Sequence, residues 1–382
     1  MKIIHIFPFS VRASGGHSNA ILEFIACQRA AGLDVTGLSP LPPAELLTEA
    51  VSAAGIRELD FADGAAVRAE IMGIADRRPA ILHVHAVNRF TEMLANDARA
   101  AGMAVVMTSH GQLNFHSGLH AVKKLIYLTF CSSQVRRCAG IHVLTRKARQ
   151  LLRFIIPGYR GLIVTLPHTI HDPPLGGGDG DVPGDAVSGG ADKPFTVICL
   201  GRLDVRTKGL DLLIEGFAKA GVERARLVLA GPDWQNGRAD LERLAKACGC
   251  AGRVDFPGAV YGADKERLLA SADLYVAASR WDAFNISVAE AMRREIPAVV
   301  SEHLNLAREL ASAGAAEVVA CRVPAIAKAI RELADDASRR RALAIKGKAW
   351  VIAHCSPDQV GAGFAAFYQQ VLIARSGAGQ AR

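Results

Sequence analysis

The sequence predicts an α/β protein made of two doubly wound units, each a parallel sheet with helices on both faces. Short apolar runs alternate with helix-length segments along most of the chain, which is typical of parallel sheets. The alternation stops in a stretch rich in glycine and proline and then starts again. At 382 residues the chain is also long enough for two domains of ordinary size.

The first half of the chain, residues 1–172, is expected to form one Rossmann-like domain. Its expected strands are 3–7, 80–85, 104–109, 141–144 and 163–166. A glycine loop that contains Gly15 and Gly16 is expected after the first strand, followed by a helix from about residue 18 to residue 31. A basic helix is expected over 146–154.

The second half, residues 194–355, is expected to form the second domain after a flexible linker at 173–193. Its expected strands are 195–200, 226–230, 254–256, 274–278, 298–301 and 317–319, with a loop at 201–208. The expected helices include 209–220, 238–247, 264–270 and 287–294. Because loops at the carboxyl ends of parallel strands form binding sites, we expect the functional site in a cleft between the two domains.

Several function classes are disfavoured by what the sequence lacks. Neither half carries a GxGxxG fingerprint after its first strand, and no Walker sequence is present, which argues against a dehydrogenase and a P-loop NTPase. The eight cysteines form no CxxC pair, so reduced thiols are expected. The first apolar run is too short for a signal peptide, and no apolar stretch reaches the ~20 residues of a membrane span. We therefore expect a cytoplasmic protein, or one attached only to a membrane surface.

The net charge of +8 does not indicate nucleic-acid binding, because the basic residues are not interleaved with aromatic ones in a recognisable motif. Basic residues concentrate between Lys123 and Arg160, next to apolar segments such as 125–128. Such a region can bind an anionic membrane surface. It can equally be a solvated positive surface, and the sequence does not decide between the two.

The segment 280–297 is the strongest candidate for a binding site. An apolar strand ends near Ala278, and a helix is expected to start near Asn285, a residue suited to capping it. The free N–H groups at a helix start can bind a diphosphate. Asp282 lies just before the helix and Glu290 within it. Glu290 is placed to accept from both hydroxyls of a ribose and Asp282 from hydroxyls of a sugar, although each could also be an ordinary surface acid.

Two further clusters follow strand ends. Arg202 and Lys208 flank the loop after the strand 195–200, and they can neutralise the charge on a leaving diphosphate. In the first half, His85 and His110 each end a strand, where a histidine can bond a sugar hydroxyl. A structural role is the commoner interpretation for either histidine taken alone.

Together these segments resemble the retaining glycosyltransferases of the GT-B fold called family 4, or group 1. The resemblance rests on Gly15-Gly16, His110-Gly111, the Arg202…Lys208-Gly209 segment and the acids Asp282 and Glu290 in the same order along the chain. Residues 110–127 are similar to members that build exopolysaccharide or lipopolysaccharide, whose acceptors are often lipid-linked. The family also ends with a helix that returns to the first domain, and residues 356–382 are the candidate.

The resemblance implies a hexosyltransferase that moves a sugar from a nucleotide-diphosphate donor with retention, without a metal or another cofactor. Arg202 and Lys208 would hold the diphosphate and Glu290 the ribose. Asp282 and the backbone of Phe284, Asn285 and Ile286 would read the sugar and phosphate. His110 would contact the sugar from the opposite domain, and backbone near Gly258 and Val260 would pack on the base. Gly15 and Gly16 would belong to the donor site.

The sequence departs from the family in several places, including Pro167-His168-Thr169, where many members carry Pro-Asn-Gly. Asp282 replaces the usual glutamate, Ala283-Phe284-Asn285 replaces Gly-Phe-Gly, and Glu295 replaces a glycine. These changes leave two alternatives open, a non-catalytic GT-B-like partner subunit and a nucleotide-sugar epimerase of related fold. The nucleotide, the sugar, the acceptor and the oligomeric state do not follow from the sequence.

Overall fold

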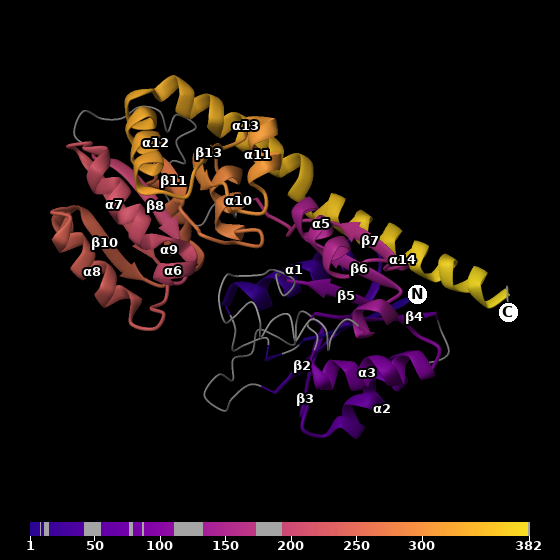
Figure 1. The fold of residues 1–382 in the computed structure, drawn as a ribbon. Helices are drawn as coiled ribbons and strands as arrows, with labels where there is room; N and C mark the ends of the chain where they lie inside the picture. Colours follow the sequence, from indigo (N-terminus) through magenta and orange to yellow (C-terminus); the bar gives the residue numbers. More distant parts are fainter. Residues whose placement is uncertain are drawn as a thin grey trace. The chain divides into compact units, whose positions relative to one another are not determined.

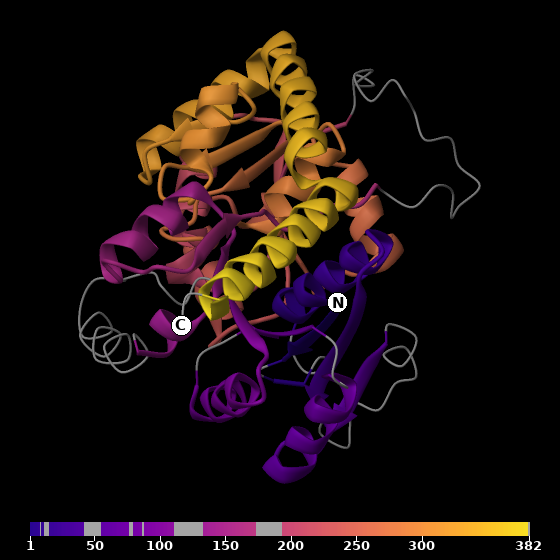
Figure 2. The same cartoon turned by 90° about the vertical axis from the view of Figure 1, so that its right-hand side faces the viewer.

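The computed structural model describes residues 1–7, 9–10, 15–41, 55–75, 79–85, 88–110, 133–172 and 193–380. The chain divides into two compact units (Figures 1 and 2). The N-terminal unit consists of Met1–Thr169 and Cys355–Arg382, and the C-terminal unit of Ile170–His354. The expected linker at 173–193, with the exception of Lys193, lies outside the described residues.

The N-terminal unit contains a parallel seven-stranded sheet in the order β3-β2-β1-β4-β5-β6-β7. Its strands are β1 (Lys2–Ile6), β2 (Asp34–Pro40), β3 (Ile56–Leu59), β4 (Ala80–Val84), β5 (Ala104–Ser109), β6 (Gly140–Val143) and β7 (Leu162–Thr165). Its helices are α1 (Gly15–Ala30), α2 (Gly64–Ala75), α3 (Arg89–Ala100), α5 (Arg146–Ile155) and α14 (Pro357–Gln380). The C-terminal helix α14 packs against α1 in this unit (Figure 2).

The C-terminal unit contains a parallel six-stranded sheet in the order β10-β9-β8-β11-β12-β13. Its strands are β8 (Phe195–Leu200), β9 (Ala225–Ala230), β10 (Val254–Gly258), β11 (Leu274–Ala277), β12 (Ala298–Ser301) and β13 (Glu317–Val319). Its helices are α6 (Val205–Lys208), α7 (Leu210–Ala220), α8 (Gly237–Ala247), η3 (Ala251–Arg253), α9 (Gly262–Ala270), α10 (Ile286–Arg293), α11 (Ala307–Ala313), α12 (Val323–Asp335) and α13 (Ala337–Cys355).

The predicted fold class, two doubly wound parallel sheets, is confirmed. Apolar side chains from strands and helices form a separate core in each unit, for example around Leu82 and Val105 in the first and around Leu227 and Val276 in the second. Strands buried on both faces explain why the strand segments are continuously apolar in the sequence. Among the described residues, no helix combines the length and apolar character needed to cross a bilayer.

The strand order reverses direction between β1 and β4 in the first sheet and between β8 and β11 in the second. At such a switch point the loops leaving the two central strands turn to opposite faces of the sheet and open a crevice. His5 and His83 are register partners across the first switch point. The loop that begins at Gly201 and the segment that begins at Ala278 leave the two strands of the second.

The structure adds β2, β3, α2 and α3, which were not among the expected elements, and two further details differ from the expectation. The helix α1 begins at Gly15, so the two glycines predicted as a loop are instead the first residues of the helix. The predicted loop 201–208 contains the one-turn helix α6, which Asp204 caps by accepting a hydrogen bond from the Thr207 backbone N–H at 2.9 Å. Asp204 supplies a short-range helix signal that the sequence interpretation missed.

Two of the unusual residues in the 280–297 segment occupy left-handed backbone. Asn285 has φ +63° and Glu295 has φ +57°. Asparagine tolerates this conformation better than other residues with a Cβ, whereas glutamate is strained in it. Glycine adopts it without strain. The structure therefore gives a backbone reason for the glycines that the resemblance leads us to expect at these two positions.

Replacing Glu295 with glycine is expected to raise the free energy of unfolding by roughly 0.5 to 1 kcal/mol, because relief of the left-handed strain outweighs the added backbone entropy. The exposed ion pair with Lys348 that is lost contributes little. Urea-induced unfolding measures the change. Glu309→Gly, within helix α11, is the matched control and should destabilise by about 1 kcal/mol. A destabilised Glu295→Gly variant would contradict the strain.

Candidate functional site

The two motifs that follow β8 and β11 are neighbours at the switch point of the C-terminal unit. Gly209, between α6 and α7, has φ +62°, and a Cβ there would lie 2.2 Å from the Ala278 carbonyl oxygen. Only glycine permits this approach. The backbone N–H of Arg280 then donates to the Thr207 carbonyl oxygen at 2.9 Å. The predicted phosphate loop and the predicted sugar-reading segment are therefore joined directly.

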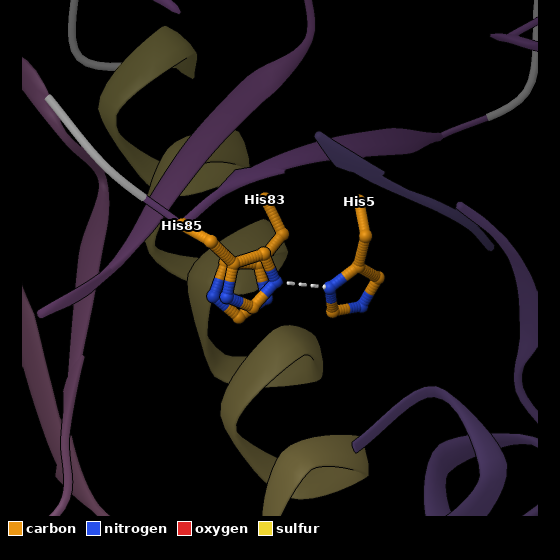
Figure 3. A group of neighbouring side chains, drawn as sticks. All are labelled: His5, His83 and His85. Atoms are coloured by element: carbon orange, nitrogen blue, oxygen red, sulfur yellow. Dashed lines mark hydrogen bonds between the residues drawn. The ribbon is translucent and has the colours of Figure 1, made fainter. Parts of the chain in front are cut away.

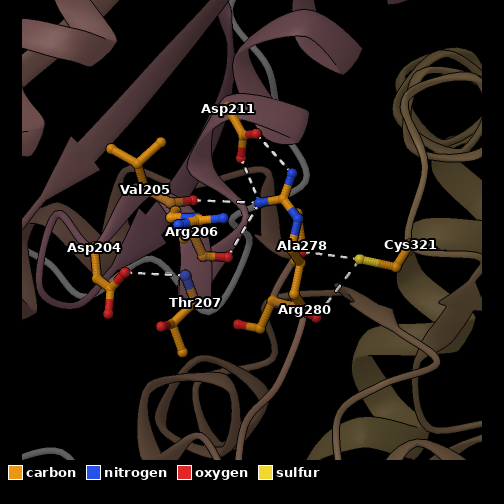
Figure 4. A network of polar contacts seen from close by, with 9 residues as sticks. Asp204, Val205, Arg206, Thr207, Asp211, Ala278, Arg280 and Cys321 are labelled. Carbon is orange, nitrogen blue, oxygen red and sulfur yellow. Dashed lines mark hydrogen bonds and ion pairs between the residues drawn. The ribbon is translucent and has the colours of Figure 1, made fainter. Parts of the chain in front are cut away.

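The Arg280 side chain strengthens this joint (Figure 4). Its guanidinium donates two hydrogen bonds to the Asp211 carboxylate, at 2.7 and 2.6 Å, and one to the Arg206 carbonyl oxygen at 3.1 Å. The Asp211 carboxylate, as the main cause, raises the Arg280 pKa further above its ordinary value. Arg280 thus stays charged and holds the turn before α7 against the end of β11. We call this set of contacts the Arg280 clamp.

Lys208 and Asp282, which were assigned separate roles, form one ion pair. Lys208 Nζ donates to Asp282 Oδ2 at 2.6 Å, and both side chains are largely buried. Burial acts to lower the Lys208 pKa, but the Asp282 carboxylate outweighs it, so the pKa is raised. Lys208 is therefore a charged ammonium, and its counterion is Asp282, the acid predicted to bind the sugar.

Arg202 is exposed, and its guanidinium lies 4.4 Å from the ring centroid of Trp234, a cation–π contact. Trp234 belongs to the loop after β9, and it is 40% exposed. The next two residues, Gln235 and Asn236, both have positive φ, so this loop holds an unfavourable backbone conformation. Trp234 restrains the direction of the Arg202 side chain and was missed in the sequence, where no local motif marks it.

The helix α10 starts as predicted at Asn285. The Asn285 side chain accepts from the Val288 backbone N–H at 3.3 Å. Phe284, just before the cap, is 1% exposed and anchors the helix start in the core. The backbone N–H groups from Ile286 onward begin the helix, where an anion is favoured.

Glu290 lies one turn into α10 and is already paired. Lys265 Nζ of α9 donates to Glu290 Oε1 at 2.8 Å. Arg294 donates to the Glu290 carbonyl oxygen at 2.8 Å and binds Glu266 through two hydrogen bonds of 2.6 Å. These contacts orient the carboxylate between α9 and α10. Lys265 and Arg294 were not singled out in the sequence, since nothing local links them to Glu290.

Tyr275 contacts both the end of β8 and the start of α10 from the interior of the sheet. It is fully buried in β11, and its hydroxyl lies 3.2 Å from both the backbone N and O of Leu200, the last residue of β8. Burial, as the main cause, raises the Tyr275 pKa well above its ordinary value, and the Ser287 hydroxyl of α10 opposes this by a hydrogen bond. A neutral phenol from within β11 therefore contacts the end of β8 and the start of α10.

The residues predicted at the base lie at the end of β10. Gly258, the last residue of β10, has φ +84°, and Val260 is half-buried in the turn that leads to α9. Tyr261, next along the chain, is 69% exposed. This edge of the C-terminal unit offers an apolar surface beside the helix that carries Lys265.

In the N-terminal unit, His85 and His110 belong to a larger network of histidines, of which Figure 3 shows His5, His83 and His85. His5 Nδ1 lies 2.6 Å from His85 Nε2, and His85 Nδ1 lies 2.8 Å from His110 Nε2. His5 Nε2 lies 2.9 Å from Gln28 Oε1. A structural role for His85 and His110, one of the two interpretations of the sequence, therefore has direct support.

A second row of contacts runs beside the first. His83 Nδ1 lies 2.6 Å from the Tyr368 hydroxyl, and His83 Nε2 lies 2.6 Å from the Thr108 hydroxyl. The Thr108 hydroxyl lies 2.9 Å from His142 Nδ1, and His142 Nε2 lies 2.7 Å from the Leu166 carbonyl oxygen. The sequence interpretation missed this network, because its members come from β1, β4, β5, β6, α1 and α14.

His5, His83 and His85 each offer a ring nitrogen within 4.8 Å of the others, as a metal site would require. However, the His83 and His85 rings stack at 4.6 Å with planes 19° apart. Lone pairs lie in the ring plane, so stacked rings do not direct them at one point. Metal ligation would also break hydrogen bonds within both rows. The geometry of these three residues favours hydrogen bonding over a metal ion.

Burial keeps these histidines uncharged. It is the main cause that lowers the pKa of His5 to about 4 and the pKa of His142 to about 4. Burial also lowers the His83 pKa well below its ordinary value, with His5 and His142 adding to the effect. Protonation of the network is thus costly at neutral pH.

The structure places the predicted site residues in both units. Arg202, Lys208, Asp282, Glu290 and the start of α10 surround the switch point of the C-terminal unit. Gly258 and Val260 follow β10 in the same unit. Gly15, Gly16 and His110 belong to the N-terminal unit, and the residues 111–132 that follow His110 lie outside the described part of the chain.

Two family models match the chain. The one described as "Glycosyl transferase 4-like domain" matches residues 15–169, and "Glycosyl transferases group 1" matches residues 185–350. Together they cover most of both units.

Curated relatives are similar over parts of their length. Mannosylfructose-phosphate synthase of Agrobacterium fabrum is 33% identical over 30% of this chain and 27% of the relative. GDP-mannose:cellobiosyl-diphosphopolyprenol alpha-mannosyltransferase of Komagataeibacter xylinus is 26% identical over 63% of this chain and 58% of the relative. Phosphatidyl-myo-inositol mannosyltransferase of Mycobacterium leprae is 26% identical over 79% of each chain. The chain thus matches only part of the first two.

Solved structures share the fold. Sucrose-phosphate synthase of Thermosynechococcus elongatus superposes with a TM-score of 0.77 at 19% identity, covering 98% of this chain and 100% of that one. Anabaena HepE in complex with UDP and glucose superposes with a TM-score of 0.73 at 16% identity, covering 97% and 100%.

The buried histidines predict acid-sensitive stability. The pKa values of His5 and His142 are lowered in the folded protein. As pH falls below about 6.5, the ordinary histidine pKa, these side chains therefore bind protons in the unfolded chain before they do so in the folded one. Each histidine is therefore expected to cost roughly 2 kcal/mol of stability between pH 7 and pH 5. Urea-induced unfolding at both pH values measures this.

The variant His142→Gln should show a smaller loss between the two pH values. His303→Gln, at an exposed position in the C-terminal unit, is the control and should behave like the unchanged protein. An unaltered pH dependence in His142→Gln would refute the assignment of acid sensitivity to the network.

Proposed function

Because the chain belongs to the group 1 glycosyltransferases, with two Rossmann-like parallel-sheet units, we propose that it transfers a sugar from a nucleotide-diphosphate donor to a glycan or lipid-linked acceptor. The supporting observation is a cluster of groups at the switch point of the C-terminal unit. It comprises the cations Arg202 and Lys208, the carboxylates Asp282 and Glu290, and the capped start of α10. This combination suits a diphosphate flanked by two polyhydroxylated groups. The proposed reaction retains the configuration of a hexose.

The proposed donor site uses residues in distinct roles. Arg202 and Lys208 bind the diphosphate and neutralise the charge that builds on it as the sugar leaves, which allows the reaction to proceed without a metal or cofactor. The N–H groups at the start of α10 support the same charge. Glu290 accepts from the ribose hydroxyls, and Asp282 accepts from hydroxyls of the sugar. The base lies near Gly258 and Val260.

The Lys208–Asp282 pair suggests how sugar and phosphate binding are coupled. Before the donor binds, Asp282 neutralises Lys208 at 2.6 Å. When a diphosphate replaces Asp282 as the partner of Lys208, the carboxylate becomes available to a sugar hydroxyl. Asp282 is one methylene shorter than the usual glutamate, and its contact with Lys208 supports the proposal that the shorter side chain can serve beside the cation assigned to the phosphate.

The acceptor is proposed to belong to exopolysaccharide or another bacterial surface polysaccharide. The polyprenol-linked substrate in the name of the Komagataeibacter relative supports a lipid-linked acceptor. All three curated relatives carry mannose in their names, so GDP-mannose belongs in the first donor screen, beside UDP-glucose.

Assays of purified protein separate this proposal from the two alternatives. A glycosyltransferase should hydrolyse its donor slowly and transfer faster when acceptor is added. A non-catalytic partner subunit should bind donor without hydrolysis, and an epimerase should turn over the sugar without acceptor. The presence of both Arg202 and Lys208 favours the transferase. Absence of binding to all tested nucleotide sugars by calorimetry would overturn the proposal.

Glu290→Gln is expected to weaken donor binding about 10-fold, because a neutral amide accepts more weakly from the ribose than a carboxylate. Isothermal titration calorimetry measures the dissociation constant. Glu332→Gln, which removes the acid of another helix ion pair with a lysine, is the matched control and should bind donor normally. Equal losses of donor binding in both variants, or loss of folding in Glu290→Gln alone, would argue for a structural role.

We also propose peripheral binding to an anionic membrane through helix α5. Arg146, Lys147 and Arg153 are exposed on this helix, and Phe154 is 82% exposed beside them. Basic side chains next to an exposed aromatic ring suit the headgroup region of an anionic bilayer. The expected basic region before residue 133 lies outside the described residues.

Phe154→Ser should lower binding to vesicles that contain phosphatidylglycerol several-fold, and raised salt should weaken the binding of the unchanged protein. Cosedimentation measures both effects. Ile345→Ser, which removes a 51% exposed apolar side chain from the C-terminal unit, is the control and should bind as before. Binding that Phe154→Ser leaves intact, or no binding by the unchanged protein, would contradict the assignment.

A further inference from the structure

The histidine network contains a constraint on where its protons lie. A neutral imidazole carries one N–H and one acceptor nitrogen. When both nitrogens of every ring are hydrogen-bonded, each ring must donate on one side and accept on the other. In a row of such rings all hydrogen bonds must therefore be donated in the same direction along the row. The group at the end of the row determines which direction that is.

The second row shows the constraint in full, because it ends at a backbone carbonyl that can only accept. His142 Nε2–H must donate to the Leu166 oxygen, so His142 Nδ1 accepts from the Thr108 hydroxyl. Thr108 in turn accepts from His83 Nε2–H, and His83 Nδ1 accepts from the Tyr368 hydroxyl. Four hydrogen bonds use four protons, and none is left over.

The first row ends at the Gln28 side chain, whose oxygen faces His5. His5 Nε2–H donates to Gln28 Oε1, so His5 Nδ1 accepts from His85 Nε2–H. His85 Nδ1 then accepts from His110 Nε2–H. The amide of Gln28 thereby determines the tautomer of a histidine three hydrogen bonds away.

The packing around the rings holds this arrangement rigid. His5, His83, His85 and Gln28 are fully buried. His83 stacks on His85, and His85 lies 5.1 Å from His110 between ring centroids. A doubly protonated ring in the row would set two N–H groups against each other, so the row also opposes a charge on any member.

We propose that Gln28 and His5 are positioning residues for His110. Acting through His85, they hold the His110 imidazole neutral with its proton on Nε2, so that Nδ1 is its acceptor nitrogen. In the proposed transferase, on which this role rests, a neutral His110 supplies no positive charge to the leaving diphosphate. The negative charge of the diphosphate is instead neutralised by Arg202 and Lys208.

The proton positions can be read without any substrate. A long-range ¹H–¹⁵N correlation spectrum of protein labelled at histidine shows which nitrogen of each ring is protonated, and His110→Gln identifies the His110 signals. At pH 7 His110 is expected to be protonated on Nε2 alone. A proton on Nδ1, or on both nitrogens, would overturn the proposal whether or not a donor is known.

Variants at Gln28 test the anchor. Gln28→Met keeps the length of the side chain and removes the acceptor, so both tautomers of His110 should appear in the spectrum. Gln28→Glu keeps an acceptor oxygen, so the Nε2–H form should persist. Thr108→Val breaks the second row between His83 and His142 and leaves the hydrogen bonds from Gln28 to His110 in place, so it serves as the control with unchanged His110 signals. A single unchanged tautomer in Gln28→Met would contradict the anchoring role.

Kinetics then connect the tautomer to the reaction. Gln28→Met should lower kcat about 10-fold, the smaller end of the effect of removing a group that orients an imidazole, while the donor dissociation constant stays within about 2-fold. Gln28→Glu should recover most of kcat. A kcat unchanged in Gln28→Met, with the tautomer shifted, would show that the His110 tautomer has no role in the reaction and would contradict the positioning role.

Discussion

The Arg280 clamp is the contact on which the candidate donor site depends. The loop after β8 and the segment after β11 are about 75 residues apart along the chain, and the parallel sheet brings only their first residues together. Together with the backbone bond from Arg280 to the Thr207 carbonyl oxygen, the clamp extends this proximity beyond the strands through the Arg206 carbonyl and the Asp211 carboxylate. Lys208 and Asp282 then meet as an ion pair, and α10 starts beside them.

A different constraint governs the N-terminal unit. Its switch point is filled by imidazoles, whereas a typical core is filled by apolar side chains. A buried polar network is stabilising only when each member is satisfied, and the row from Tyr368 to the Leu166 carbonyl oxygen meets this condition by running in one direction. The arrangement links the tautomer of a candidate sugar-binding residue to an amide on α1. The same burial that keeps the rings neutral also makes the unit sensitive to acid.

Much of the fold could be predicted from the sequence, because its signals are local. Apolar runs marked most of the strands, and Asn285 marked the start of α10. The partners of the candidate residues could not be predicted in this way. Lys265 and Glu290 lie on different helices, and His5 meets His85 only through the register of β1 and β4. Such pairs depend on tertiary contacts that leave no periodic pattern in the sequence.

The central claim is that the switch point of the C-terminal unit binds a diphosphate. The most direct measurement compares the dissociation constants of nucleoside diphosphates, such as UDP and GDP, with those of the matching monophosphates. The account predicts that at least one diphosphate binds about 10-fold more tightly than its monophosphate, and that Lys208→Gln removes the difference. Equal affinity for both forms, or a preference that survives in Lys208→Gln, would contradict the account.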